Sequence, residues 1–394
     1  MNNINIKEMN ENRKIRVAIT HGDTNGIGYE LIFKTFAEPE MLELCTPIIY
    51  GSPKTAAYHR KALDIQTNFS IVNSAEEIED GRINLIPCFD EEVKVDMGQP
   101  TPESGKAALK ALDCAMTDYR KDLYDVLVTA PLSCGNIEAE GFKFPGHAEY
   151  IETSLGDGKK SMIICVHDDL RIATVSNRCA FKDIASDITK DNIQRKATLF
   201  FEALRRDFNI SNPRIAVLSL NAINKEGELG TEEKEIIEPA INELASQGIQ
   251  AFGPYTATTF FGSGAYDEFD GILGMYHDQG IAPFKALTDE RNVKFAAGIP
   301  IVTTSPDMTP CFSIAGQGVV DETAFRHAIF LAIDIFRNRQ RYDEPLSHPL
   351  PKLYHERRDE SEKVRFSIPK KHENGTSRKP QGKPTTNTDT QEES

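Results

Sequence analysis

Residues 270–280 join an apolar run to a group of polar side chains that could do chemistry. The run at 271–275 is typical of a buried strand, and Gly280 would let the chain turn sharply after it. Because open α/β sheets bind ligands at the carboxyl ends of their strands, we expect His277 and Asp278 to lie at such an end. A His beside an Asp can ligate a metal or act as a general base. A His that only stabilises a turn is an equally good interpretation.

Three further residues are site candidates, and two of them, His147 and Lys285, suit an anion. His147 precedes a helix expected to begin near Ala148, and helix N-termini favour anions. A structural His at the helix start explains the same pattern. Lys285 follows His277 by eight residues and is a candidate cation, although a lone Lys is normally a surface residue. Asp307 follows a predicted strand and is a site candidate, with an Asx-turn as the alternative.

The glycine-rich loop at 22–28 has a weak resemblance to a dinucleotide-binding loop. It follows a predicted strand at 14–20 and opens a predicted helix at 29–36. Its glycine spacing does not match GxGxxG, and no ribose-binding acid follows at the right distance. We therefore interpret the glycines as allowing close backbone approach, with Asp23 facing a site.

The candidate residues lie between predicted strands and helices that alternate along the chain. Such alternation predicts an α/β fold with a largely parallel sheet covered on both faces. The predicted strands lie at 14–20, 46–50, 125–129, 161–166, 171–175, 214–218, 271–275 and 301–304. The predicted helices lie at 29–36, 104–119, 190–207, 232–247 and 322–337.

Composition narrows the class of protein further. The 394 residues carry a net charge of −15, which disfavours nucleic-acid binding but allows a small anionic ligand held by local cations. The seven cysteines have no CxxC spacing, which is typical of buried thiols in a reducing compartment. Neither a signal peptide nor a membrane span is predicted, so we expect a cytoplasmic protein. We expect a flexible N-terminus (1–13), a two-lobed core (14–342) and a disordered tail (343–394).

Taken together, the segments resemble the 4-hydroxythreonine-4-phosphate dehydrogenase family of vitamin B6 biosynthesis. The resemblance covers roughly residues 14–340, and MYHDQG is its most specific motif. The matching segments, in family order, are GDxxGIGxE (22–30), VTAP (128–131), FPGHxE (144–149), GPY (253–255), MYHDQG (275–280), GIPI (298–301), TSxD (304–307) and AG (315–316).

The resemblance implies a two-domain α/β/α fold of the isocitrate/isopropylmalate dehydrogenase type and a homodimer with its active site at the interface. It implies NAD-dependent oxidation of 4-phosphooxy-threonine, followed by loss of CO2 to give an amino-ketone phosphate. It also implies a divalent metal (Zn, Mg or Co) held by three histidines as a Lewis acid.

Residue by residue, the resemblance assigns His277 as the third metal histidine. It assigns His147 and Lys285 as substrate contacts and Asp307, with Asp278, as catalytic residues. Lys294 stands where the family has an Asn of the substrate pocket, and we count it as substrate-binding.

The chain departs from the family at the other metal positions. Arg178 and Ile223 replace the two remaining metal histidines. One histidine cannot hold a catalytic metal tightly, because three protein ligands are usual. Arg178 would instead bring a permanent positive charge. Other family positions are changed as well: Thr303 replaces an Arg, Thr258 an Asp, Cys134 a Lys, and Met308, Thr309 and Pro310 replace His, Gly and Thr.

Three hypotheses follow. The first, and our primary one, is a dehydrogenase of the family type, in which His167 or His21 could supply a missing ligand. The second is an enzyme with a metal-free site for another anionic substrate, contacted by Lys294 and Arg178. The third is a non-catalytic paralogue that binds a phosphorylated metabolite or a partner subunit.

Overall fold

The computed structural model describes residues 13–89, 93–133, 135–136, 144, 146–177, 180–222 and 230–347. These residues belong to one compact unit that ends at Ser347. All but Arg13 of the N-terminal segment expected to be flexible, and the tail beyond Ser347, lie outside the described residues, so both remain predictions.

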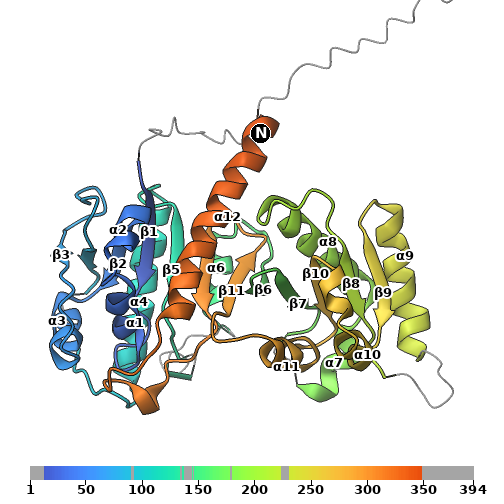
Figure 1. Cartoon of the computed structure of the whole chain (residues 1–394), viewed down its shortest axis with the longest axis horizontal. Coiled ribbons are helices and arrows are strands. Elements are labelled where there is room, and N and C mark those ends of the chain that lie inside the picture. The colour runs from blue at the N-terminus through green and yellow to red at the C-terminus, as the bar shows by residue number, and fades with distance from the viewer. Residues whose placement is uncertain are drawn as a thin grey trace, which may run out of the picture. The chain divides into compact units, whose positions relative to one another are not determined.

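A single twelve-stranded sheet runs through this unit (Figure 1). The spatial order of its strands is β3-β4-β2-β1-β5-β12-β11-β6-β7-β10-β8-β9. The strands are β1 (Ile15–Thr20), β2 (Cys45–Gly51), β3 (Ser70–Ile71), β4 (Asn84–Pro87), β5 (Val126–Thr129), β6 (Met162–His167), β7 (Leu170–Thr174), β8 (Ile215–Leu218), β9 (Ala251–Tyr255), β10 (Gly271–Gly274), β11 (Val293–Ala297) and β12 (Val302–Pro306).

Strand direction changes only in the middle of the sheet. The strands from β3 to β12 in this order are parallel, and so are β7, β10, β8 and β9. Between these groups, the pairs β12–β11, β11–β6 and β6–β7 are antiparallel. The sheet is therefore largely parallel, as the sequence predicts, with an antiparallel centre that the sequence did not reveal.

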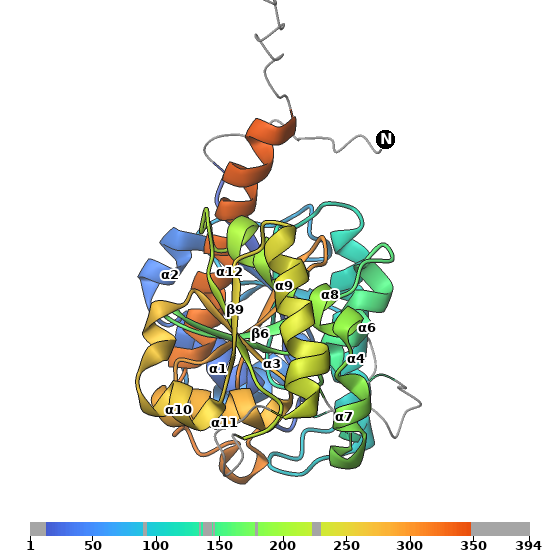
Figure 2. The ribbon, with the colours of Figure 1, turned by 90° about the vertical axis from the view of Figure 1, so that its right-hand side faces the viewer.

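Helices lie on both sides of the sheet (Figure 2). They are α1 (Gly28–Thr35), α2 (Pro39–Leu44), α3 (Pro53–Ala62), α4 (Pro102–Tyr119), α6 (His147–Leu155), α7 (Ile184–Asp187), α8 (Lys190–Arg206), α9 (Glu238–Ser246), α10 (Ala257–Gly262), α11 (His277–Leu287) and α12 (Thr323–Ser347). Within the described ranges, no helix combines the length and apolar composition needed to cross a membrane.

Local sequence accounts for the best-defined helices. In α8, the Thr189 side chain accepts a hydrogen bond from the backbone N–H of Asn192 and caps the helix. The helix then buries Ile193, Ala197 and Phe200, whose spacing places them on one face. In α12, a similar apolar face packs on β12, β5 and β11. These two helices hold the antiparallel centre of the sheet.

The predicted α/β fold is confirmed, and so are the predicted strands and helices, with shifted ends. Two local predictions need correction. Gly280 does not make a turn: it lies inside α11, and a Cβ there would come within 3.0 Å of the Ile172 side chain. The core also extends beyond residue 342, because α12 continues to Ser347 and Asp343 forms an ion pair with Arg206.

Candidate functional site

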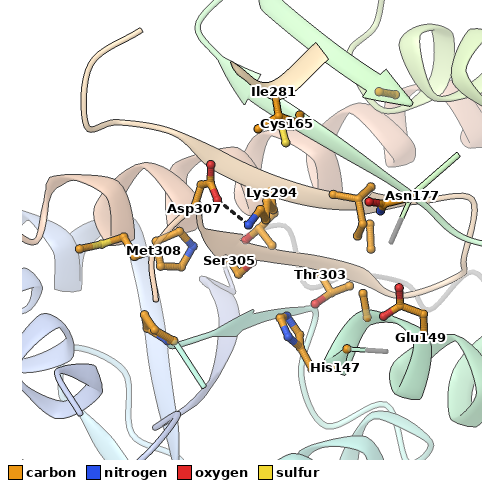
Figure 3. A pocket seen from close by; sticks show the side chains of 18 of the residues that line it. His147, Glu149, Cys165, Asn177, Ile281, Lys294, Thr303, Ser305, Asp307 and Met308 are labelled. Carbon is orange, nitrogen blue, oxygen red and sulfur yellow. Dashed lines mark ion pairs between the residues drawn. The ribbon is translucent and has the colours of Figure 1, made fainter. Parts of the chain in front are cut away.

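A cavity of about 330 Å³ lies on one face of the antiparallel centre of the sheet. It is lined by residues of β6, β7, β11 and β12, by the first residues of α6, by α11, and by the segment after β5. Figure 3 shows the side chains that line it. Of the predicted site residues, it brings together His147, His277, Lys285, Lys294 and Asp307.

Strand register places one row of side chains across the floor of the cavity. Lys294 of β11 pairs with Ser305 of β12 on one side and with Cys165 of β6 on the other. Cys165 in turn pairs with Ile172 of β7. Because paired residues share a face of the sheet, these four side chains reach the same cavity from four strands.

Asp307 is the centre of charge in the cavity. Its side chain is only 5% exposed and forms ion pairs with Lys294 and, at 2.7 Å, with Lys285 (Figure 3 shows the Lys294 pair). Burial by itself would raise the pKa of the Asp307 carboxyl group. The two ammonium groups outweigh burial, so the pKa lies below its ordinary value of 3.8. The group of three therefore carries a net charge of about +1 at neutral pH.

Backbone contacts fix Asp307 at this point. It follows the last residue of β12, and its N–H donates a hydrogen bond to the carbonyl oxygen of Asn292, at 2.9 Å. The Thr304 hydroxyl donates to the carbonyl oxygen of Ala328 at 2.8 Å and so ties β12 to α12. The carboxylate is thus held by the sheet rather than by a free loop.

His147 approaches the cavity from another wall. It is the first residue of α6, where backbone N–H groups and the helix dipole favour an anion. Its Nε2 lies 3.2 Å from the Thr129 hydroxyl at the end of β5. In Figure 3 the His147 side chain lies beside Thr303, on the far side of the cavity from Asp307. An elongated anion could therefore contact His147 at one end and the lysines at the other.

His277 is the first residue of α11 and lines the same cavity. Its Nδ1 lies 2.8 Å from a carboxylate oxygen of Asp278, whose side chain is 86% exposed. Asp278 itself does not line the cavity. The carboxylate can therefore orient the imidazole of His277, but it contacts a ligand only through His277.

The other residues of the MYHDQG motif (275–280) stabilise the fold around the cavity. The side-chain amide of Gln279 donates to the carbonyl oxygen of Ser219 at 2.6 Å and accepts from the N–H of Met275 at 2.7 Å. It links the ends of β8 and β10. Gly280 lets α11 lie close to β7.

Cys165 is a lining residue that the sequence did not single out. Its thiol is buried, and burial together with the charge of Asp307 raises its pKa to about 12. The thiol therefore stays protonated and acts as a small neutral part of the floor. Its only sequence signal is alternation within β6, which cannot tell a cavity from ordinary core.

The loop at 22–28 does not contribute to this cavity. Asp23 is buried, accepting hydrogen bonds from the Asn25 N–H and the Asn136 side chain. Burial raises the pKa of Asp23. A Cβ on Gly28 would lie 1.9 Å from the carbonyl oxygen of His21. Close backbone approach is thus confirmed, but Asp23 binds neighbouring residues rather than facing the cavity.

The described part of the chain does not supply a metal centre of the expected kind. It contains no group of three or more His, Cys, Asp or Glu side chains that could hold a metal ion. Neither alternative ligand lines the cavity, because His21 is fully buried elsewhere and His167 lies beside Asp168 and Asp289. Arg178 and Ile223 lie outside the described residues, but neither is a usual metal ligand. The donor set does not fit the three-histidine centre.

A cavity of this size, lined by two lysines and by the N-terminus of a helix, is typical of an α/β protein that binds a small ligand. Comparison with known proteins gives the family. The family model "Pyridoxal phosphate biosynthetic protein PdxA" matches residues 43–332, and the chain belongs to this family.

Two relatives illustrate how much of the chain is shared. A 4-hydroxythreonine-4-phosphate dehydrogenase of Bacteroides thetaiotaomicron is 55% identical over 357 residues, which cover 90% of this chain and 98% of the relative. One from Sulfurihydrogenibium sp. is 32% identical, covering 83% of this chain and 100% of the relative.

Solved structures agree with these relatives. A 4-hydroxythreonine-4-phosphate dehydrogenase of Burkholderia phymatum is 29% identical, with a TM-score of 0.68 over 82% of this chain and 99% of that chain. The enzyme of the same name from Klebsiella pneumoniae is 25% identical, with a TM-score of 0.70 over 82% of this chain and 99% of that chain. The α/β fold predicted from the resemblance is confirmed, and its division into two domains stays a prediction.

Proposed function

We propose that this protein is an NAD-dependent dehydrogenase that oxidises 4-phosphooxy-threonine and releases CO2, as a step in pyridoxal phosphate biosynthesis. The observation that carries the proposal is the convergence of His147, Lys285, Lys294 and Asp307 on one cavity. Its volume is at the lower end of the usual range for small-ligand pockets and suits a phosphorylated amino acid. Family membership supplies the reaction.

The cationic groups bind and orient the substrate. The substrate's two anionic groups lie at opposite ends of the cavity, one against His147 at the start of α6 and the other against the ammonium group of Lys285. Lys294 contacts the group beside Lys285 from the floor of the cavity. Asp307 stays ionised between the two lysines, so its task is to hold them in place rather than to carry a proton.

The His277–Asp278 pair moves the proton in the first step. The imidazole accepts the proton of the substrate hydroxyl, and NAD⁺, when bound, would supply the acceptor for the hydride on the same carbon. Asp278 orients the ring through Nδ1. The β-keto acid formed then loses CO2, and a proton replaces it to give the amino-ketone phosphate.

We expect the enzyme to act as a homodimer in the cytoplasm, as the resemblance implies, and to bind no nucleic acid because of its net charge of −15. Light scattering on the purified chain measures the assembly. A monomer at working concentrations would contradict this part of the proposal.

NADH formation by the purified full chain tests the function. The assay supplies NAD⁺ and 4-phosphooxy-threonine, with EDTA in one series and a divalent cation in another. We expect NADH and CO2 in equal amounts, and far slower turnover of 4-hydroxythreonine because it lacks the phosphate that the cations bind. Absence of both products from a folded chain, in every series and with a panel of other phosphorylated hydroxy acids, would contradict the proposal.

A further inference from the structure

We propose that Lys294 makes the cavity a metal-independent oxyanion site, so that a phosphate monoester binds equally well with and without divalent cations. This inference rests on the proposed function for the identity of its ligand. It concerns the group that supplies positive charge to that ligand.

Lys294 lies at the centre of the cavity floor. In the sheet, Lys294 pairs with Ser305 and Cys165. The aliphatic part of its side chain therefore extends from the sheet into the cavity. The side chain is 39% exposed. An ammonium group has three N–H donors, and an ion pair with one carboxylate oxygen leaves the others able to reach a ligand.

The charges around Asp307 do not cancel. Asp307 neutralises one of its two lysines, and its buried carboxylate is itself stabilised by both. One positive charge therefore remains on the lysine side of the cavity before any ligand or metal arrives. The Glu149 carboxylate, which offsets it in the net charge of the whole cavity, lies on the other side near His147 (Figure 3). Fixed positive charges of this kind bind oxyanions without the reorganisation that a mobile surface lysine requires.

The side chains of the cavity do not suit a divalent cation. A divalent cation needs several oxygen, nitrogen or sulfur ligands around it, and the described residues offer no group of three or more His, Cys, Asp or Glu side chains that could supply them. Within the cavity, the ammonium groups of Lys285 and Lys294 would also repel a divalent cation placed near Asp307. The same surroundings favour a phosphate or carboxylate group.

Calorimetric binding of 4-phosphooxy-threonine by the full chain tests this inference without reference to turnover. We expect the Kd to be the same, within about twofold, in EDTA and in excess magnesium or zinc, since no metal takes part. Lys294→Met should weaken binding roughly 10- to 100-fold in EDTA, the range for loss of one charge-assisted hydrogen bond. Lys294→Arg, which keeps the charge, should retain most of the affinity.

The controls separate charge at the site from charge in general. Lys61→Met removes one exposed lysine at the end of α3 and should change the Kd by less than about twofold. Lys294→Met should still fold, because Lys285 remains to pair with Asp307. Inorganic phosphate and 4-hydroxythreonine serve as separate probes and show whether Lys294 binds the phosphate or the carboxylate.

Two results would overturn the inference: strong loss of wild-type binding in EDTA, or unchanged binding by Lys294→Met. The wild-type comparison alone decides if the variant does not fold. Failure of the proposed function gives a different pattern, in which binding depends on Lys294 but no NADH forms. Metal-dependent NADH formation together with metal-dependent binding would refute the inference and leave the function standing.

Discussion

Two segments of this protein have nearly the same sequence pattern and opposite roles. The loop at 22–28 and the segment at 275–280 each follow a strand, contain glycine and polar residues, and lead into or begin a helix. In the first, Asp23 is buried and hydrogen-bonded to its neighbours. In the second, His277 is half exposed and lines a cavity. The role depends on whether the polar groups are already bonded within the protein, and sequence alone does not contain this information.

Gly28→Ala should have the largest effect, because the new Cβ would lie 1.9 Å from the backbone oxygen of His21 and neither backbone segment can move freely. We expect a loss of at least about 4 kcal/mol in the free energy of unfolding, or no folded protein. Gly262→Ala is the control, because nothing lies within 4 Å of a Cβ there. Denaturant titration measures both variants. Equal stability of the two would show that the 22–28 loop is not tightly packed.

The pH dependence of stability tests the same buried region. Burial lowers the pKa of His21 to about 4 from an ordinary value of 6.5. Between about pH 6.5 and about pH 4, His21 is therefore protonated in the unfolded chain but neutral in the folded chain. The free energy of unfolding falls as the pH drops through this range. The loss amounts to about 3 kcal/mol, and above pH 6.5 His21 contributes no slope. In His21→Met this part of the slope should vanish in denaturant titrations across that range. A variant with the wild-type slope would assign the loss to other groups.

Gln279→Ala probes the structural part of the second segment. Two hydrogen bonds that link β8 to β10 disappear, which should cost about 2 kcal/mol of unfolding free energy. Gln66→Ala removes a single exposed hydrogen bond to Asp64 and should cost less than about 0.5 kcal/mol. If the Gln279 variant is as stable as the Gln66 variant, the two hydrogen bonds of Gln279 do not stabilise the fold, which would contradict its structural role.

The smallest effect is expected for Asp278→Asn. The carboxylate is 86% exposed and acts only by orienting His277, so kcat should fall by less than about tenfold. His277→Asn removes the proton acceptor itself and should lower kcat by roughly 100-fold or more. Similar losses in the two variants would mean that Asp278 takes part directly. Steady-state kinetics with NADH as the readout distinguishes these cases.

Much of the fold could be predicted because buried parallel strands are apolar throughout, as in β1 and β5. β11 was missed because its segment, VKFAA, is short and carries a charge, and its place in the sheet is set by partners distant in the sequence. The start of α11 was missed because Tyr276 gives no side-chain cap, and Gly280 and Pro283 lie within the helix.

The site residues could be chosen by type, but not their partners. Asp307 and Lys285 were chosen by residue type and position, and the family resemblance gave them roles, whereas Lys294 was chosen through its departure from the family. Their mutual pairing depends on the register between β11 and β12, which fixes Lys294 opposite Ser305 and close to Asp307. Register is a tertiary property, so the charge balance of the cavity could not be read from the sequence.

The order of strands also bears on how the chain is made. β5 and β6 are both synthesised early, but they become joined only when β12 and β11 insert between them near the end of the described core. A nascent or truncated chain that stops before residue 293 would leave both strands with open edges, which are prone to pair with other chains. Such a fragment should aggregate rather than keep partial activity, because the floor of the cavity is also the last part of the sheet to close.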